Sequence, residues 1–324
     1  MYFVSFVTQE KIFANEEKLI ELETITLEEV TEFSRKLCAS TYVEGFIHGN
    51  VSQEDALALG NIVLAGLDSK PLPDQNITHM RIHKLPPGEH VIYAKDVYGP
   101  DNPNSAIEYC IQVGSISDPK VRTMLNLISQ IGQEIAFDQL RTKEQLGYMV
   151  YSGVRKQSEM ISYRVIIQSE KDPMILENRI EAFLEMFRVV LEQIPEQEFN
   201  KHKAALIAKL TEKLKNLSQE SSKLWSTITS QYYDFDQNEN DALMVATFEK
   251  AELLDFFDNN LSANTPNRRK ISVHMRSQQI STLTEYSLKI ASNIIHDEDV
   301  VQFKSKLELT KLPEPVNSIN TWII

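Results

Sequence analysis

Apolar side chains recur every three or four residues along two long stretches, which is the pattern of a helix with one buried face. The first stretch begins after Asp118 and Pro119, which suit a helix start because Asp can cap free N–H groups and Pro fits the first turn. Its apolar positions are Val121, Met124, Leu125, Ile128, Ile131 and Ile135. The second, over 175–194, has its apolar positions at Ile180, Phe183, Leu184, Phe187 and Leu191. Both are predicted to be long helices that cover a core.

Capping residues and shorter periodic stretches predict five more helices. Thr26 and Ser52 suit N-cap positions, and each is followed by acidic residues in the first turn, where the helix dipole favours them. The predicted helices span 27–40, 53–67, 195–215, 218 onward and 249–259.

Short apolar or alternating runs between polar turns predict strands. These runs lie at 44–50, 79–85, 90–95, 107–113, 146–154, 160–168 and 269–275. From residue 105 the order is a strand, a helix, two strands, four helices and a strand. This order predicts an α+β fold in which helices cover a largely antiparallel sheet.

The predicted elements divide the chain into three parts. They are 1–78, which ends in helix, strand and helix; 79–104, a linker with two entry strands; and 105–324, a second domain whose pattern weakens from about 279. Six prolines between 69 and 103 favour the linker. Two interpretations of the start stay open: Met1 interrupts a longer protein, or it is a natural start with a small edge strand.

Composition narrows the class of protein. The chain has 324 residues, enough for about two domains. Its 33 basic and 46 acidic side chains give a net charge of −13, which repels nucleic-acid phosphates. No apolar run approaches the roughly 20 residues of a membrane-spanning helix, and the start lacks the segments of a secretory signal. Because the two cysteines also fit a reducing compartment, we expect a cytoplasmic protein without nucleic-acid or membrane partners.

A search for catalytic motifs finds none that the chain completes. His79 and His83 have the spacing of a zinc pair, but no Glu lies nearby, and solvated strand histidines are the simpler interpretation. Pro86 stands where the inverted zinc motif His-x-x-Glu-His, ending at His90, would need its first His. We therefore expect no metal site in this chain. Two further residues are predicted to be small core residues rather than nucleophiles: Cys38 and Cys110.

One polar stretch, Arg141–Tyr148, joins the end of the first long helix to a strand. Arg141 offers a planar fork of N–H donors and Tyr148 a phenol O–H, and both suit the binding of a peptide carbonyl or a developing oxyanion. Gly147 indicates a close backbone approach or a bulge. The alternative is structural, with Arg141 capping the helix C-terminus and Tyr148 packing in the sheet. The residues alone leave both interpretations open.

The residues Arg141–Tyr148 resemble a segment in the C-terminal half of the pitrilysin-type zinc metallopeptidases, the family of insulin-degrading enzyme and the fungal a-factor-processing proteases. The resemblance covers about residues 20–276. It is carried further by 47–50, 166–171, 179–184, 201–202 and 272–274.

This resemblance implies a protein of two halves around an enclosed chamber, each half with two similar α+β domains of the LuxS/MPP-like metallohydrolase fold. The chain would be the rear part of an incomplete third domain and the whole fourth domain. Zinc would be bound by the N-terminal half, the partner of this chain, and peptides would be the substrates. Arg141 would hold the substrate backbone, and Tyr148 would help to stabilise the tetrahedral intermediate. A homodimer is also compatible with the family.

A second site is implied by the same resemblance at Lys213, Lys215 and Ser218. They match a basic segment that binds ATP and other polyanions in the family. This chain has Asn216 where the family has another lysine and Leu214 where it has a proline, which lowers the local charge. The alternative is a solvated helix end, where the dipole favours lysines.

Two functions therefore remain. The leading hypothesis is the non-catalytic C-terminal half of a zinc metalloendopeptidase, inactive alone because it lacks His-x-x-Glu-His. The alternative is a stand-alone peptide-binding or scaffold protein of the same fold. An upstream reading frame that encodes the zinc motif would distinguish them.

Overall fold

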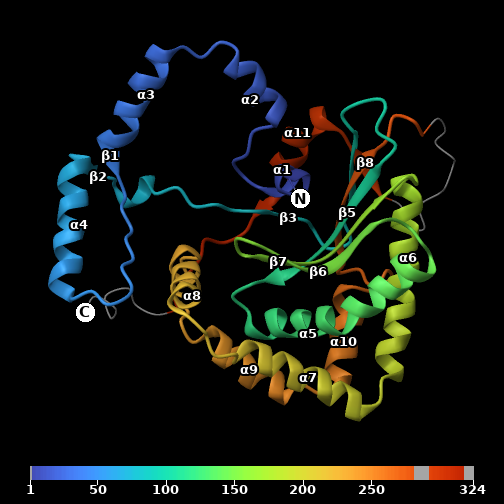
Figure 1. Ribbon diagram of the computed structural model, residues 1–324. Helices are drawn as coiled ribbons and strands as arrows, with labels where there is room; N and C mark the ends of the chain where they lie inside the picture. Colours follow the sequence, from blue (N-terminus) through green and yellow to red (C-terminus); the bar gives the residue numbers. More distant parts are fainter. Residues whose placement is uncertain (1, 281–291, 317–324) are drawn as a thin grey trace. The chain divides into compact units, whose positions relative to one another are not determined.

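The structure is a computed structural model that describes residues 2–280 and 292–316 (Figure 1). The chain forms two compact units and passes between them more than once. We call them unit 1, which comprises Met1–Glu10, Arg81–Glu212 and Asp234–Pro313, and unit 2, which comprises Lys11–Met80, Lys213–Tyr233 and Glu314–Ile324.

Unit 1 is built on a mixed sheet of six described strands. In spatial order they are β6 (Met149–Gln157), β7 (Met160–Ser169), β5 (Ser105–Ser115), β8 (Arg269–Arg276), β4 (His90–Asp96) and β9 (Asn293–Ile295). The pairs β6·β7, β7·β5 and β5·β8 are antiparallel, whereas β4 runs parallel to β8 and β9. The predicted α+β class is thus confirmed, and so are the two consecutive strands predicted at 146–154 and 160–168, which pair antiparallel as β6 and β7.

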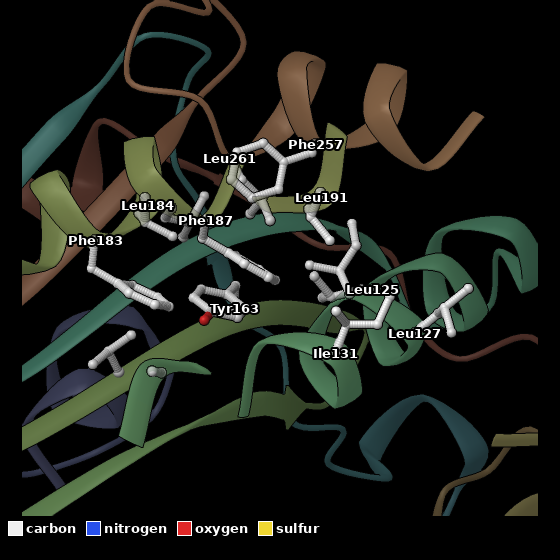
Figure 2. Packing of buried hydrophobic residues seen from close by; sticks show 14 of the residues in the cluster. Leu125, Leu127, Ile131, Tyr163, Phe183, Leu184, Phe187, Leu191, Phe257 and Leu261 are labelled. Carbon is white, nitrogen blue, oxygen red and sulfur yellow. The ribbon is translucent and has the colours of Figure 1, made fainter. Parts of the chain in front are cut away.

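Helices α5 (Pro119–Ala136) and α6 (Pro173–Gln193) cover one face of this sheet. Helices α7 (Glu196–Leu210), α9 (Gln237–Thr247) and α10 (Lys250–Asn260) pack against them, and the apolar stripes predicted from the sequence are buried in between. Asp118 caps α5 by accepting hydrogen bonds from the N–H groups of Lys120 and Val121. Figure 2 shows the core, in which Tyr163 of β7 lies beneath Phe183 and Phe187 of α6. Burial of such stripes is the main stabilising contribution in a domain of this size.

Helix α1 (Tyr2–Thr8) packs against the opposite face of the sheet. Phe3 stacks on Tyr93 of β4 with ring centroids 5.6 Å apart, and Ser5 accepts a hydrogen bond from Arg155 of β6. The small edge strand that one of the two interpretations of the chain start implied is therefore wrong. Val4, Val7 and Thr8 are buried at the i, i+3, i+4 spacing of one helical face, and Phe6 is buried beside them.

Small elements complete unit 1. Strand β3 pairs antiparallel with β10, and a short helix follows β9. Their bounds are β3 (His83–Lys84), β10 (Glu308–Leu309), η3 (Asp297–Asp299) and α11 (Val300–Ser305). Within the described residues, no helix combines the length and the apolar character needed to cross a bilayer.

Unit 2 is mostly helical in its described residues. It contains α2 (Asn15–Leu22), α3 (Leu27–Ala39), α4 (Gln53–Leu67), the single turn η1 (Asp74–Asn76) and α8 (Leu217–Thr229). Thr26 and Ser52 cap α3 and α4 as predicted, each accepting a hydrogen bond from a first-turn N–H group. The two-residue strands β1 (Ser40–Thr41) and β2 (Lys70–Pro71) pair parallel. None of the four α-helices contains a buried residue.

The strand predicted at 44–50 is extended backbone without a strand partner among the described residues. Alternate side chains hold it against α8 and the turn after it. Glu44 accepts a hydrogen bond from Tyr233, Phe46 stacks on Trp225 at 6.2 Å, and His48 Nδ1 lies 2.8 Å from Ser221 Oγ. The alternating pattern that predicted a strand therefore reflects a real extended segment that contacts a helix through every second residue.

Other predicted boundaries differ from the structure. The entry strand predicted at 90–95 is confirmed as β4, which lies between β8 and the edge strand β9. Helix α7 ends at Leu210 rather than near Lys215, and β6 begins at Met149 rather than Leu146. Helix α9 was not predicted, because its first turn is wholly polar. Of the weakly patterned tail after 279, residues 281–291 and 317–324, the apolar end included, lie outside the described residues.

Candidate functional site

The segment that carries Arg141 and Tyr148 begins where α5 widens into a π-type turn, η2 (Phe137–Lys143). The turn closes when the Glu144 N–H donates to the Gln139 carbonyl and the Leu146 N–H donates to the Leu140 carbonyl, each at 3.0 Å. Leu146 is buried and packs into the core cluster of unit 1. The backbone therefore leaves the helix in one defined direction before it enters β6.

Gly147 lets this segment pass directly against the end of β7. A Cβ atom at this position would lie 1.8 Å from the carbonyl oxygen of Gln168. No side chain fits that distance, so the contact requires glycine. The close approach predicted for Gly147 is confirmed, and it places Tyr148 just before the start of β6.

Arg141 and Tyr148 lie together at this point. The Arg141 guanidinium lies over the Phe137 ring at 4.8 Å and over the Tyr148 ring at 5.5 Å. Its Nε donates to the Tyr148 carbonyl oxygen at 3.0 Å. Tyr148 is 88% exposed, so it does not pack in the sheet, and the Arg141 Nε bonds beyond the helix instead of to its last carbonyls. The predicted packing of Tyr148 in the sheet is therefore wrong, and Arg141 bonds to the backbone of the segment instead of capping the helix.

Both residues line a cavity of about 620 Å³. Its wall includes Arg141, Gly147, Tyr148, Gln168, Glu170 and Lys171. The lining offers N–H and O–H donors from side chains that reach solvent rather than the apolar interior. A guanidinium fork beside a phenol can hold a carbonyl oxygen and stabilise negative charge that develops on it.

A second set of charged groups is sealed between α6 and β8. Glu177 accepts hydrogen bonds from Lys270 and from His274, whose Nε2 lies 2.6 Å away. Glu181 accepts from Arg268 at 2.9 Å, and all five side chains are buried. Burial raises the pKa of Glu177, but the bond to His274 and the charge of Lys270 outweigh it and lower that pKa to about 2. The sequence did not indicate this cluster, because buried and exposed charges look alike in a sequence.

The predicted polyanion residues belong to unit 2. Lys213 and Lys215 lie in the connection between α7 and α8, Ser218 lies in the first turn of α8, and all three are exposed. Asn216 caps α8 by accepting from the Gln219 N–H at 2.9 Å. The lysines therefore precede a helix N-terminus, where the dipole does not favour them.

The histidines and cysteines considered for chemistry belong to different units. His79 Nδ1 lies 2.8 Å from Gln231 in unit 2, whereas His83 is buried in β3 of unit 1. Cys110 is buried, which raises the pKa of its thiol to about 12, but Cys38 is exposed on α3, so its predicted core position is wrong. Across residues 2–280 and 292–316, no three His, Cys, Asp or Glu side chains gather in a way that could hold a metal ion.

Comparisons with known proteins identify a family model and solved structures that are similar to this chain. The family model "PQQ synthase PqqF-like, C-terminal lobe domain 4" matches residues 127–225, which include the Arg141–Tyr148 segment. The crystal structure of pitrilysin superposes with a TM-score of 0.80 at 21% identity and covers 95% of this chain and 32% of pitrilysin. A protease from Helicobacter pylori matches with a TM-score of 0.54 at 14% identity over 78% of this chain and 59% of its own. These likenesses show the α+β fold.

Curated relatives are more similar in sequence. Insulin-degrading enzyme from Drosophila melanogaster is 33% identical over 97% of this chain and 32% of its own length. The A-factor-processing enzyme of Saccharomyces cerevisiae is 32% identical over 97% of this chain and 31% of its own. The chain thus spans about a third of the length of these relatives. Because the homology covers nearly the whole chain and the matching family model describes a C-terminal lobe, the chain belongs to the family of insulin-degrading enzyme, A-factor-processing enzyme and pitrilysin-like zinc proteases and matches their C-terminal lobe.

Proposed function

We propose that the chain is the non-catalytic C-terminal half of a zinc metalloendopeptidase and supplies substrate-binding and charge-stabilising groups to an enclosed chamber. The observation that carries this proposal is the placement of Arg141 and Tyr148 together on an open polar cavity. A buried pair would have served only the fold.

In this function the two residues act on the scissile peptide. The Arg141 guanidinium donates hydrogen bonds to the substrate backbone and fixes its direction along the cavity. The Tyr148 O–H donates to the carbonyl oxygen as it gains negative charge, which is the step that a preorganised donor accelerates most. Tyr148 needs no change of protonation for this role.

Zinc belongs to the other half in this proposal. The described residues of this chain offer no set of ligands that fits the ion. When bound in the N-terminal half, zinc would supply an activated water. The residues of this chain would then orient the peptide and stabilise its developing charge.

The exposed apolar faces in unit 2 support such a partner. A row of side chains on α3 is more than half exposed although it has the spacing of a buried face: Val30, Phe33 and Leu37. Helix α4 is similar, with Leu57, Leu59, Ile62, Val63 and Leu64 at least half exposed. Exposed rows of apolar side chains at helical spacing are typical of an interface. The rest of the same protease, its N-terminal half included, is the partner that we propose.

Reconstitution tests the proposal. The chain is mixed with the N-terminal half of a fungal relative, and cleavage of an internally quenched peptide is measured with and without a zinc chelator. We expect no cleavage by the chain alone and chelator-sensitive cleavage by the mixture. Arg141→Ala and Tyr148→Phe should lower kcat by on the order of a hundredfold while KM changes less.

A matched control separates the phenol from a general surface effect. Tyr98 is also highly exposed in unit 1, at 78%. Tyr98→Phe should leave turnover unchanged. Chelator-sensitive cleavage by the chain alone would overturn the proposal, and so would equal activity of the Tyr148→Phe and Tyr98→Phe mixtures.

A further inference from the structure

We propose that Glu144 and Arg179 are positioning residues that set the placement of Arg141 and Tyr148 on the cavity. This inference rests on the proposed function, since it assigns to the same site a support that lies behind it. Neither Glu144 nor Arg179 lines the cavity itself.

Glu144 is held by three charge-assisted or polar contacts. Arg179 donates to it from Nε at 2.6 Å and from Nη2 at 2.8 Å, the two-pronged geometry that fixes both partners. Gln139 donates from Nε2 at 2.7 Å. The Glu144 side chain is only 14% exposed, and the hydrogen bonds from Arg179 hold the pKa of its carboxyl below the ordinary value. The carboxylate is therefore charged and paired throughout the neutral pH range.

Arg179 provides a rigid base for this contact because it lies on α6. Its neighbours on the helix, Ile180 and Phe183, are buried in the core, and Glu177 and Glu181 are tied to β8 through the sealed charge cluster. A helix anchored in this way has little freedom to move as a unit, so the backbone of Arg179 is held in place. The ion pair thus ties the end of η2 to a part of unit 1 that is fixed from both sides.

The segment needs this support because its backbone is strained where it turns. Gln145 adopts a φ of +50°, in the left-handed region that side chains other than glycine and asparagine rarely occupy. This residue lies between Glu144 and the buried Leu146. If Glu144 is released, Gln145 can relax, and the shift passes directly to Gly147 and Tyr148.

The pairing of Glu144 also determines which arginine remains available to bind the substrate. Its oxygens contact Arg179 and Gln139, while Arg141 makes its bond to the Tyr148 carbonyl. A carboxylate paired with Arg141 would compete with the substrate carbonyl for the same donors. Pairing Glu144 with Arg179 therefore leaves the Arg141 fork directed at the cavity.

The test uses substitutions that separate positioning from stability. Arg179 is 45% exposed, and an ion pair at such a position contributes little to folding. Arg179→Ala and Glu144→Gln should therefore leave the urea midpoint of the full chain nearly unchanged. The same variants should shift the NMR resonances of the Arg141 Nε–H and of the Tyr148 ring. In the mixture with the N-terminal half, kcat should fall by roughly tenfold to a hundredfold, with a smaller change in KM.

Two variants make the result specific. The exchanged pair Glu144→Arg with Arg179→Glu should recover the resonances and most of kcat, because it restores the contact with reversed polarity. Arg188→Ala removes a similar two-pronged ion pair from the same helix, to Asp258 of α10 at 2.6 and 2.9 Å, far along α6 from the segment. Arg188→Ala should change neither the resonances nor kcat.

The outcomes separate this inference from the proposed function. If Arg179→Ala and Glu144→Gln leave the resonances and kcat unchanged while Arg141→Ala abolishes turnover, the positioning role is overturned and the proposed function stands. If the resonances shift but Arg141→Ala and Tyr148→Phe do not affect turnover, the proposed function fails. Loss of kcat that the exchanged pair does not recover would also contradict the positioning role.

Discussion

Helices α6 of unit 1 and α3 of unit 2 have similar apolar stripes and opposite surroundings. On α6, the stripe is at most 2% exposed: Ile180, Phe183, Leu184, Phe187 and Leu191. On α3, the corresponding residues are 51%, 63% and 61% exposed: Val30, Phe33 and Leu37. Unit 1 offers a six-stranded sheet beneath its helices, whereas the described sheet of unit 2 has two strands of two residues.

This contrast shows that forming a helix and burying its apolar face are separate steps, although one sequence pattern indicates both. A capping residue and a periodic stripe are enough to define a helix, and α3 has both, with Thr26 and Glu29 bonded in a capping box. Burial of the stripe needs a second layer, which the helix sequence does not encode. The sequence thus predicted both helices correctly and could not predict which of them would be covered.

The largest effect should come from the centre of the unit 1 core. Phe187 is fully buried, stacks on Phe183 at 5.6 Å and meets Phe257 edge to face at 5.8 Å. Phe187→Ala removes these contacts and leaves a cavity, so we expect the free energy of unfolding to fall by about 3–5 kcal/mol. Urea unfolding, monitored by hydrogen exchange of the β7 amides, measures this loss of free energy. A loss under 1 kcal/mol would show that the core of unit 1 is loosely packed and that the contrast is weak.

The second-largest effect is expected from acid, which should lower the free energy of unfolding of unit 1. Burial, with the nearby charges of Lys270 and Arg268, lowers the pKa of His90 from an ordinary 6.5 to about 4. His90 is therefore neutral in the folded state. Its contribution to the free energy of unfolding is fully present above pH 6.5 and is lost as the pH drops toward 4. Glu177, with a pKa of about 2 against an ordinary 4.5, adds a loss as the pH drops from 4.5 toward 2. We expect the first loss to be on the order of 2 kcal/mol.

His90→Gln isolates the first step. The variant should lose the pH dependence between 6.5 and 4 and retain the dependence below 4.5, as measured by the urea midpoint across this range. The same pH slope in the variant and the parent chain would contradict the assignment to His90.

Overpacking of the core should have an effect of similar size to that of acid. Gly132 of α5 faces the Phe187 ring, and a Cβ atom there would lie 2.7 Å from its Cζ. Gly132→Ala gains helix propensity but forces the ring to move, so we expect a net loss of about 1–3 kcal/mol. Gly60→Ala in α4 of unit 2 is the matched control, since a Cβ there meets nothing within 4 Å. It should be neutral or slightly stabilising, and equal losses for the two variants would remove the contrast.

The candidate site was partly accessible from the sequence. Arg141, Gly147 and Tyr148 stood out because their chemistry and the glycine in a strand setting were unusual, and the structure brings them together. Glu144 and Arg179 are 35 positions apart, and nothing local relates them, so their contact required the fold. The polyanion site at Lys213, Lys215 and Ser218 stays a prediction, because a match to a basic segment does not show by itself whether the segment binds an anion.

The smallest effect is expected at Phe33 of α3. Its ring is 63% exposed, so Phe33→Ala removes little buried area, and the change in unfolding free energy of the chain alone should stay within about 0.5 kcal/mol. The same substitution should weaken association with an N-terminal half more than tenfold, because the exposed face would then be buried and Phe33 would fill part of the interface. Titration of the chain with that half, followed by peptide cleavage, measures the second effect. A large loss of stability in the chain alone would show that α3 is already covered, whereas unchanged association would show that its apolar face serves a different partner.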